Sequence, residues 1–210
     1  MDRQKENFTD ISSYLNKREE IIRASSKLFR NLGYIGTSMK DIADEVGLVK
    51  ASLYHHFSGK EELLNEVLNK GIDQILATAQ TIFDKHELNP RDKLKQLIQN
   101  HILHLTTNNE FLLIASNQID KLTEQHREKY IAKRDMYEKL LRETLEKGIQ
   151  TGDFPPIDVR LTVLAIFGMC NWLIQWYQQN GPYTAQYIGD YFSNLICDRM
   201  LAKSSNFNLD

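Results

Sequence analysis

Apolar residues recur at three- and four-residue steps along most of this 210-residue chain, and this spacing constrains the fold more than any other feature. An α-helix has 3.6 residues per turn, so such spacing gathers apolar side chains on one helical face. Glycine (10) and proline (4) are scarce, and no strand-like alternation of any strength appears. We therefore predict an all-α fold of about nine helices. The longest stripe, over residues 60–84, consists of Leu64, Val67, Leu68, Ile72, Ile75, Ala79 and Ile82.

Short breaks separate the predicted helices. A first helix from Lys17 is expected to end at Gly33 and to bury Ile21, Leu28 and Leu32. A later helix over 120–147 is expected to bury Tyr130, Met136, Tyr137, Leu140, Leu141 and Leu145. Hydroxyl or carboxylate residues stand where several helices begin, as N-capping requires. These predicted caps are Thr37 or Ser38, Ser58, Asp158 and Thr184.

Two short helices follow one another across Gly47, after the first helix. Helix, short helix, glycine turn and short helix is the organisation of a helix-turn-helix DNA reader. Glycine readily adopts the left-handed conformation that such a turn needs. By itself this spacing is weak evidence, because many helical proteins place glycine between short helices. The small core that would fix the two helices consists of Ile42, Ala43, Val46, Leu48 and Leu53.

The charge distribution narrows the DNA-binding hypothesis to one segment. The whole chain has a net charge of −2, so any nucleic-acid binding must come from a local basic patch. Residues 1–60 contain ten Lys+Arg and eight Asp+Glu, a net charge of only +2. The window 46–60 contains no acidic residue, and it holds Lys50, His55, His56 and Lys60.

Each polar residue of this region has an expected role on duplex DNA. Lys50, Ala51 and Ser52 occupy the N-terminal end of the second short helix, which faces base edges in the major groove. A lysine there suits guanine, and a small alanine suits a thymine methyl group. Surface charge alone would also explain Lys50 and Lys60, and core packing would explain Tyr54. The residues expected to reach phosphates are Thr37, Ser38, Tyr54, His55 and Lys60.

Residues 33–64 resemble the N-terminal domain of the TetR family of transcriptional repressors. The family pattern runs G-(Y/F)-x-x-(T/S)-(T/S), I-A-x-x-x-G, L-Y-x-H-F and (S/G)-K-E-x-L. Two departures are Val49, where the family often has a capping Ser or Thr, and Ala51, which replaces a frequent Gly. The matching residues are Gly33, Tyr34, Thr37, Ser38, Ile42, Ala43, Gly47, Leu53, Tyr54, His56, Phe57, Lys60 and Glu61.

The resemblance implies a cytoplasmic homodimer that binds an inverted-repeat operator in double-stranded DNA and blocks transcription. The chain would then consist of a flexible N-terminal arm (1–16), a DNA-binding domain (17–77), a ligand-binding and dimerisation domain (78–203) and a tail (204–210). The helix over 60–84 joins the two domains and is the expected lever of a two-state switch.

The most apolar run of the chain is 161–177. It is at the lower limit of length for a membrane span, contains polar residues and lacks a basic flank, so no membrane association is expected. A buried core helix and a subunit interface remain as alternatives. TetR-like dimers pair their last two helices, which here implies an interface formed by Leu164, Gly168, Trp176, Tyr191 and Leu195.

The second half of the chain is similar, more loosely, to a TetR subgroup that senses acyl-CoA thioesters. The segments GIQTGDF, FG and NW carry this similarity. It implies an acyl-CoA or another lipophilic effector, with Arg127 and Arg134 available for CoA phosphates. The alternatives are an ordinary helical core and a DNA-binding dimer controlled by a protein partner or by abundance. The expected pocket consists of Leu105, Phe111, Tyr137, Leu141, Phe167, Asn171 and Trp172.

Catalysis is not expected, because no GxSxG, P-loop, HExxH or Rossmann signature is present. His101 and His104 stand three residues apart and could approach a metal, but no carboxylate completes a ligand set, so a helical surface pair is the preferred interpretation. We predict neither a metal nor a cofactor. The two cysteines form no disulfide framework, and the first twenty residues lack a signal-peptide core, which agrees with a cytoplasmic protein.

Overall fold

The structure, a computed structural model, describes residues 2–107, 114 and 118–202, with side chains described from residue 13 onward. Every regular element among these residues is helical, so the predicted all-α class is confirmed. The chain divides into two compact units, one formed by 1–71 with 110–130 and the other by 72–109 with 131–210. The helices α4 (Lys60–Phe83) and α7 (Glu124–Thr151) each run through both units.

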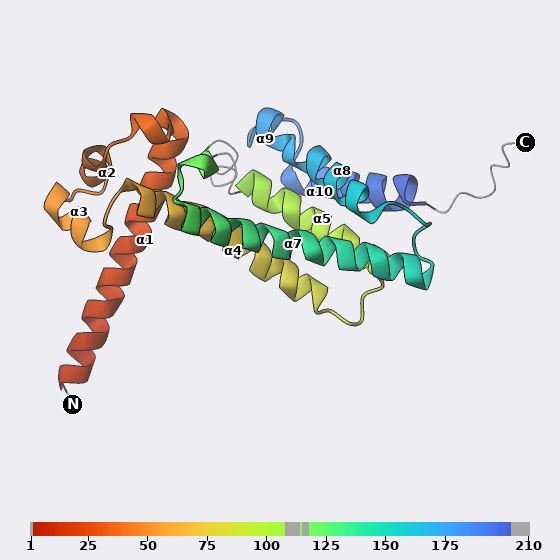
Figure 1. The fold of residues 1–210 in the computed structure, drawn as a ribbon, viewed down its shortest axis with the longest axis horizontal. Helices are drawn as coiled ribbons and strands as arrows, with labels where there is room; N and C mark the ends of the chain where they lie inside the picture. Colours follow the sequence, from red (N-terminus) through yellow and green to blue (C-terminus); the bar gives the residue numbers. More distant parts are fainter. Residues whose placement is uncertain (1, 108–113, 115–117, 203–210) are drawn as a thin grey trace, which may run out of the picture. The chain divides into compact units, whose positions relative to one another are not determined.

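The first unit contains α1 (Asp2–Gly36), α2 (Met39–Glu45) and α3 (Lys50–His56), shown in red and orange in Figure 1. Its α1 begins at Asp2 instead of Lys17, so the backbone of the expected flexible arm is helical. No glycine or proline interrupts the sequence before Gly33, and the helix therefore extends toward the N-terminus. Gly33 has a φ of 74°, which ends the regular helix as predicted.

The buried face of α1 differs from the predicted one. Ile21 is fully buried, but Leu28 is only half-buried and Leu32 is 55% exposed, so the prediction for Leu32 is wrong. Leu32 falls on the same side of α1 as Ile21 and Ser25, but it stands in the last turn before Gly33, beyond the buried part of this face. The remaining buried residues of this face are Ile22, Ser25, Ser26 and Phe29.

The small core between α2 and α3 forms as predicted. Gly47 has a φ of 65° and makes the left-handed turn between the two helices. Leu48, just after the turn, is half-buried. The fully packed members of this core are Ile42, Ala43, Val46 and Leu53.

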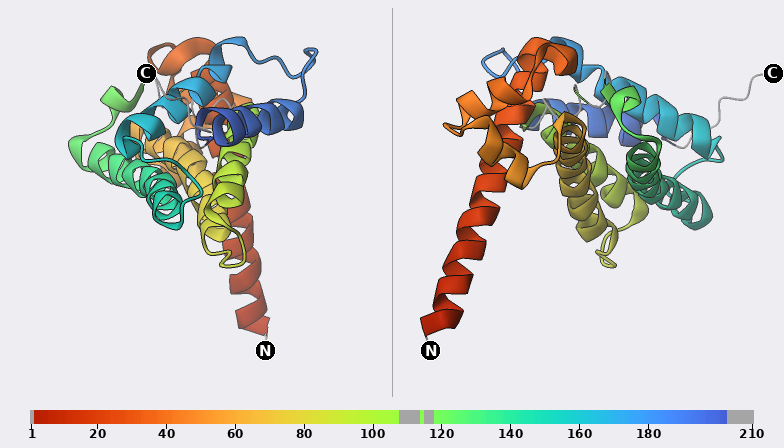
Figure 2. Two further views of the ribbon diagram at one scale, coloured as in Figure 1. Left: turned by 90° about the vertical axis from the view of Figure 1, so that its right-hand side faces the viewer. Right: turned by 60° about the vertical axis from the view of Figure 1, so that its left-hand side comes forward.

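The second unit is built around α5 (Pro90–Thr107), which packs against α8 (Val159–Asn171), α9 (Leu173–Trp176) and α10 (Ala185–Asn194). Figures 1 and 2 show α5 alongside α10, which continues into a π-helical turn, η2 (Leu195–Met200). A 3₁₀ turn, η1 (Ile119–Lys121), precedes α7 in the first unit. Asp158 and Thr184 cap α8 and α10 as predicted. The apolar residues on the inner side of α5 are all buried, namely Leu94, Leu97, Ile98, Ile102 and Leu105.

The inner face of α7 agrees with its prediction except at Met136, which is 56% exposed. Tyr130, Tyr137 and Leu141 stand seven and four residues apart and share the buried side of the helix, whereas Met136 points about 100° away from Tyr137, toward the exposed side. The other predicted inner residues are buried, namely Tyr130, Leu140, Leu141 and Leu145.

The chain turns back on itself tightly at the end of α7. Phe154 is buried against Gly148, where a Cβ atom would lie 2.2 Å from Phe154 Cδ2 and 3.2 Å from Pro90 Cβ. The guanidinium of Arg91 lies 5.1 Å from the centre of the Phe154 ring and donates a hydrogen bond to the carbonyl of Asp153. This corner therefore joins α5 to α7 and to the loop that follows it.

Candidate nucleic-acid interface and effector region

The two short helices of the first unit are held by different end contacts. At the start of α2, Ser38 Oγ accepts from the Asp41 N–H at 3.2 Å, and Asp41 Oδ2 accepts from the Ser38 N–H at 2.8 Å. This reciprocal pair is a capping box, and it confirms Ser38 as the cap. Val49 precedes α3 without a side-chain cap, as the sequence predicts. Leu53 and Phe57 are fully buried and anchor α3 by one face.

The opposite face of α3 is exposed and carries no acidic side chain. Val49 is 70% exposed, and Tyr54 is also exposed. Lys50 Nζ lies 5.9 Å from the centre of the Tyr54 ring. Of the other residues with an expected DNA contact, Ala51 and His55 are exposed and Ser52 is half-buried. The surface required for reading DNA is therefore accessible at the side chains that the sequence singled out.

Thr37 and Lys60 occupy internal positions instead. Thr37 is 1% exposed, and its hydroxyl donates to the Gly33 carbonyl at 2.9 Å, so the predicted DNA contact of this hydroxyl is wrong. Lys60 Nζ donates to the carbonyls of Tyr34 and Thr37 at 2.7 and 2.8 Å and lies 4.4 Å from the centre of the Tyr34 ring. The Thr37 hydroxyl therefore bonds the turn before α2 to the end of α1, and Lys60 bonds the same turn to the start of α4. A lysine ammonium has three N–H donors, so one N–H of the half-buried Lys60 is not used by these two hydrogen bonds.

A polar cluster lies between α5, α7 and α8 in the second unit. His101 and Tyr137 are buried in it, whereas Phe167 is half-buried and Asn171 is exposed. His101 Nε2 lies 2.9 Å from Asn171 Oδ1, and His101 Nδ1 lies 3.0 Å from the Tyr137 hydroxyl. The Phe167 ring packs on both rings, with centroids 5.3 Å from His101 and 5.7 Å from Tyr137. Three of the residues expected to line the pocket are thus brought together around His101, which sequence analysis did not assign to it.

Burial determines the charge of this cluster. It lowers the pKa of His101 to about 4, and it raises the pKa of Tyr137, so neither side chain is charged at neutral pH. An amide oxygen can only accept, so Nε2 of the neutral His101 carries the proton and donates to Asn171. Nδ1 then accepts from the Tyr137 hydroxyl. The cluster is therefore internally satisfied and uncharged.

The preferred interpretation of His101 and His104 as a surface pair is wrong. His101 is buried because it falls on the same α5 stripe as Leu97, Ile98 and Leu105, a register visible in the sequence. His104 is half-buried. Among the residues that the structure describes, no group of three or more His, Cys, Asp or Glu side chains could hold a metal.

The stability of the protein is expected to fall below pH 6.5 because His101 is buried and neutral. The unfolded imidazole binds a proton at its ordinary pKa of 6.5, whereas the folded one binds it only near pH 4. The unfolded state holds more protons between these values, so lowering the pH favours unfolding. The free energy of unfolding should drop by about 3 kcal/mol from this residue between pH 7 and pH 4.

Urea unfolding at pH 7 and pH 4 measures this loss, with His101→Gln as the non-titrating reference. The wild-type protein should lose more stability than the variant over this range. Equal losses would show that His101 is solvated in the folded protein.

The other residues of the expected pocket lie in different surroundings. Leu105 and Leu141 are fully buried, whereas Trp172 is 64% exposed. Phe111 lies outside the described residues. The two arginines expected to meet CoA phosphates differ in accessibility, since Arg127 is half-buried and Arg134 is exposed.

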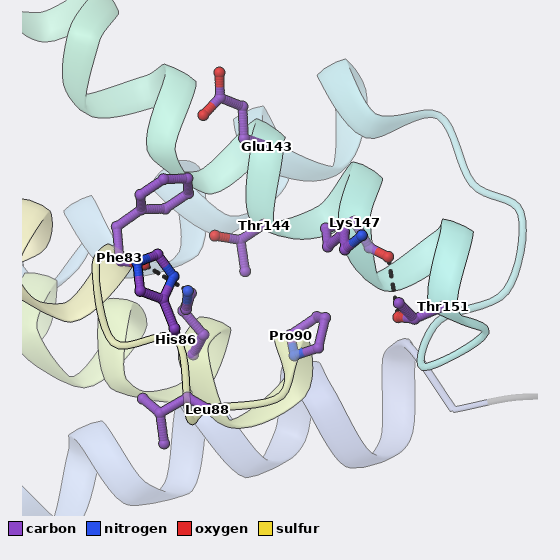
Figure 3. Close-up of a pocket in the computed structure, with 9 residues that line it drawn as sticks. Phe83, His86, Leu88, Pro90, Glu143, Thr144, Lys147 and Thr151 are labelled. Carbon is purple, nitrogen blue, oxygen red and sulfur yellow. Dashed lines mark hydrogen bonds between the residues drawn. The ribbon is translucent and has the colours of Figure 1, made fainter.

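A cavity of about 230 Å³ lies elsewhere in the second unit (Figure 3). In that view Leu88 and Pro90, which follow α4, lie opposite Thr144 and Lys147 of α7. No residue of the expected pocket lines it, and sequence analysis missed it because a loop forms one of its walls. The lining residues are Phe83, His86, Leu88, Pro90, Lys93, Glu143, Thr144, Lys147 and Thr151.

Exposed apolar residues line one side of α8 and α9, and exposed tyrosines stand just before and along α10. We call this set the apolar face, and it comprises Leu161, Leu164, Gly168, Trp172, Trp176, Tyr183, Tyr187 and Tyr191. Its tyrosines form a stacked row, with ring centroids 5.6 Å apart for the first pair and 6.4 Å for the second. Leu195, which the resemblance also assigns to the dimer interface, is half-buried. Exposed apolar side chains that gather on one face are typical of sites of association.

Part of this surface belongs to a segment, Val159–Trp176, that is long and apolar enough to cross a membrane. A single such segment is weak evidence for a membrane protein, because interface and core helices have the same composition. Trp172 separates α8 from α9 within it.

Comparison with known protein families shows to which family the chain belongs. Residues 21–67 match the family described as bacterial regulatory proteins, tetR family. Residues 87–200 match the tetracyclin repressor-like C-terminal domain. The chain belongs to the TetR family. The first match covers the second half of α1, α2, α3 and the start of α4, and the second extends from the loop before α5 to the end of η2.

Individual TetR-family proteins are similar to this chain over most of its length. The HTH-type transcriptional repressor KstR2 of Mycobacterium tuberculosis is 30% identical over 184 residues, which cover 86% of this chain and 91% of that protein. The crystal structure of PfmR from Thermus thermophilus has a TM-score of 0.79 at 33% identity and covers 85% of this chain and 97% of that one. AibR, in complex with isovaleryl coenzyme A and operator DNA, has a TM-score of 0.74 at 29% identity over 85% and 96% of the two chains.

The family assignment fixes the broad role of this TetR-family chain. TetR-family proteins are transcriptional regulators with an N-terminal helix-turn-helix rather than enzymes. The resemblance of residues 33–64 to this family is thereby confirmed.

Proposed function

We propose that this TetR-family protein is a ligand-responsive repressor that binds an inverted-repeat operator as a homodimer. A small apolar effector, such as an acyl-CoA, releases it from the DNA. The observation that carries the proposal is the exposed, acid-free face of α3 on a tightly packed helix-turn-helix.

The side chains of α3 and of its surroundings have distinct roles in this proposal. Lys50, Ala51 and Ser52 contact base edges in the major groove, which gives sequence preference. Tyr54 and His55 contact phosphates, which gives affinity and register. The hydroxyl of Ser38 accepts from Asp41 within the capping box, and it can still donate its own hydrogen to a phosphate.

The apolar face supports the dimer. Two recognition helices enter adjacent major grooves only when they are held about 34–36 Å apart, so a TetR-type reader needs a partner. Pairing the apolar faces of two chains would cover the exposed leucines, tryptophans and tyrosines in a two-fold interface. Gly168, which has no neighbour within 4 Å of a Cβ position, leaves room for close approach of a partner helix.

The polar cluster around His101 supports the effector hypothesis. An acyl-CoA presents an apolar chain and a neutral thioester, and Tyr137, Phe167 and Asn171 offer a matching apolar wall with polar groups. The related AibR was crystallised with isovaleryl coenzyme A, which favours the same ligand class here. Arg127 and Arg134 remain the candidates for the CoA phosphates.

Two helices carry the proposed signal. Both α4 and α7 run through both units, so a change in the second unit reaches the first along either helix. Within the first unit, Glu61 of α4 accepts from the Thr123 N–H at 2.8 Å and pairs with His126 Nδ1 at 2.9 Å. These contacts join the starts of the two helices. A coupling of about 1–3 kcal/mol is enough to change operator occupancy by one or two decades.

Selection of bound sequences from random DNA, followed by displacement with a panel of acyl-CoAs, tests the proposal. An inverted repeat should be enriched, and one acyl-CoA should lower its affinity. Lys50→Ala should change the preferred bases, whereas Lys147→Ala on α7 should not. Failure to enrich any sequence would refute the DNA-binding part, and saturating acyl-CoA without effect on affinity would refute the effector part.

The full burial of Leu105, Tyr137 and Leu141 favours a second candidate, a DNA-binding dimer without a small effector. Protein partners or abundance would then control it. Thermal stabilisation by acyl-CoAs, or an apolar ligand that co-purifies with the protein, would argue against this candidate.

A further inference from the structure

Three side chains in the middle of α1 contact the C-terminal ends of the two helix-turn-helix elements. They are Tyr14, Lys17 and Arg18, and all three precede the segment 21–67 that matches the family. The expected boundary of the flexible arm falls among them. Through these contacts, this part of α1 binds the C-terminal end of α3.

The two basic residues bind carbonyl oxygens at helix ends. Lys17 Nζ donates to the carbonyl of Val46, the C-cap of α2, at 3.0 Å. Arg18 Nη1 donates to the carbonyl of His56, the last residue of α3. The Arg18 guanidinium also lies 4.1 Å from the centre of the Phe57 ring, directly after that helix.

Tyr14 completes the set on the same helix end. Its ring stacks on His56 with centroids 4.7 Å apart, and its hydroxyl lies 3.5 Å from the His55 carbonyl. Burial, together with the nearby positive charge of Arg18, lowers the pKa of His56, which favours the neutral imidazole in this stack beside the guanidinium.

Such contacts matter for a helix as short as α3. It has seven residues and no side-chain cap at its N-terminus, so its own ends fix its orientation weakly. The last carbonyls of a helix lack internal partners and carry partial negative charge, which cationic donors satisfy. Arg18 also lies 3.9 Å from Glu62 and 3.7 Å from Glu66 of α4, which links α3 to a third helix.

We propose that Tyr14, Lys17 and Arg18 form a clamp that positions α3 for reading the operator, without touching the DNA themselves. The proposal rests on the proposed function, since it concerns the same DNA-binding helix. It extends the DNA-reading machinery of this chain to residues that precede the family match. Loss of the clamp lets α3 tilt, so base contacts suffer more than phosphate contacts, which tolerate a change of angle.

Arg18→Met in the full-length protein tests the clamp, with Arg23→Met as the matched control. Arg23 lies on the same helix, is exposed, and has no hydrogen bond or ion pair with any other described residue. Affinities for the selected operator and for unrelated DNA are measured across salt concentrations, at a temperature where circular dichroism shows each variant folded. The pair of variants separates loss of the clamp from loss of one positive charge.

The clamp predicts that Arg18→Met binds the operator roughly tenfold more weakly than Arg23→Met, as expected for loss of a charged hydrogen bond. Affinity for unrelated DNA and the salt dependence should match those of the control. Arg18→Lys should recover much of the operator affinity, because lysine can still donate to the His56 carbonyl. Lys17→Met, which loses the bond to the Val46 carbonyl, should act in the same direction and replaces Arg18→Met if that variant does not fold.

Two results would overturn the clamp. Operator affinities that are equal for Arg18→Met and Arg23→Met would show that Arg18 does not position α3. A salt dependence of Arg18→Met that is lower by about one unit than that of the control would show that Arg18 binds a phosphate directly. If the wild-type protein selects no operator at all, the proposed function itself fails and the clamp falls with it.

Discussion

Replacing Leu164 by glutamate should abolish operator binding by this protein. Leu164 is half-exposed on the apolar face of α8, close to Gly168 along the same side of the helix. In a homodimer paired through this face, the glutamate would be buried without a partner, which costs several kcal/mol. The dimer should therefore dissociate, and operator affinity should fall roughly 100-fold or more because each chain retains a single half-site.

Light scattering after size exclusion and an operator titration together test this expectation. Met136→Glu provides the control, since Met136 is about equally exposed but lies on α7, which contributes no residue to the apolar face. The control should remain dimeric and bind normally. A Leu164→Glu protein that stays dimeric and keeps its operator affinity would mean that the dimer forms elsewhere.

Gly148→Ala should be among the most destabilising single-methyl additions in the chain. A Cβ atom at this position would lie 2.2 and 2.5 Å from two carbons of the Phe154 ring. The ring is buried beneath Arg91, so it cannot move aside without breaking the corner that joins α5 to α7. Overpacking of this kind costs about 1–3 kcal/mol, which should exceed the helix-propensity gain of about 1 kcal/mol from replacing glycine by alanine.

Denaturant unfolding measures directly whether Gly148→Ala lowers or raises the free energy of unfolding. Gly189→Ala on α10 is the matched control, because its Cβ would meet Gln99 at an ordinary distance of 3.6 Å. The control should be neutral or slightly stabilised. A Gly148→Ala protein as stable as the control would show that Phe154 can repack at little cost.

Local features of the fold could be predicted from the sequence. The caps at Ser38, Asp158 and Thr184 depend only on neighbouring residues, so the sequence contains all that determines them. The buried faces of α4 and α5 also follow from the sequence, because a long row of apolar residues at helical spacing determines which side of the helix faces the core. The exposure of the acid-free segment at α3 follows from the same local pattern.

Features that depend on distant partners could not be predicted. The hydroxyl of Thr37 was expected to face DNA, but packing turns it toward Gly33. His101 becomes an internal residue because Tyr137 and Asn171, on two other helices, supply its hydrogen bonds. The hydrogen bond from Arg18 to the end of α3 joins two residues that stand 38 positions apart in the sequence, and no local sequence pattern indicates it.

The uncharged state of the cluster around His101 has a consequence for ligand discrimination. In the proposed effector site, a fatty acid would bring an ionised carboxylate next to a neutral imidazole, a phenol and an amide, with no counter-ion among them to offset its lost hydration. A thioester of the same acid brings no charge to that place. A regulator built in this way would respond to the activated form of a metabolite and ignore the free acid from which it is made.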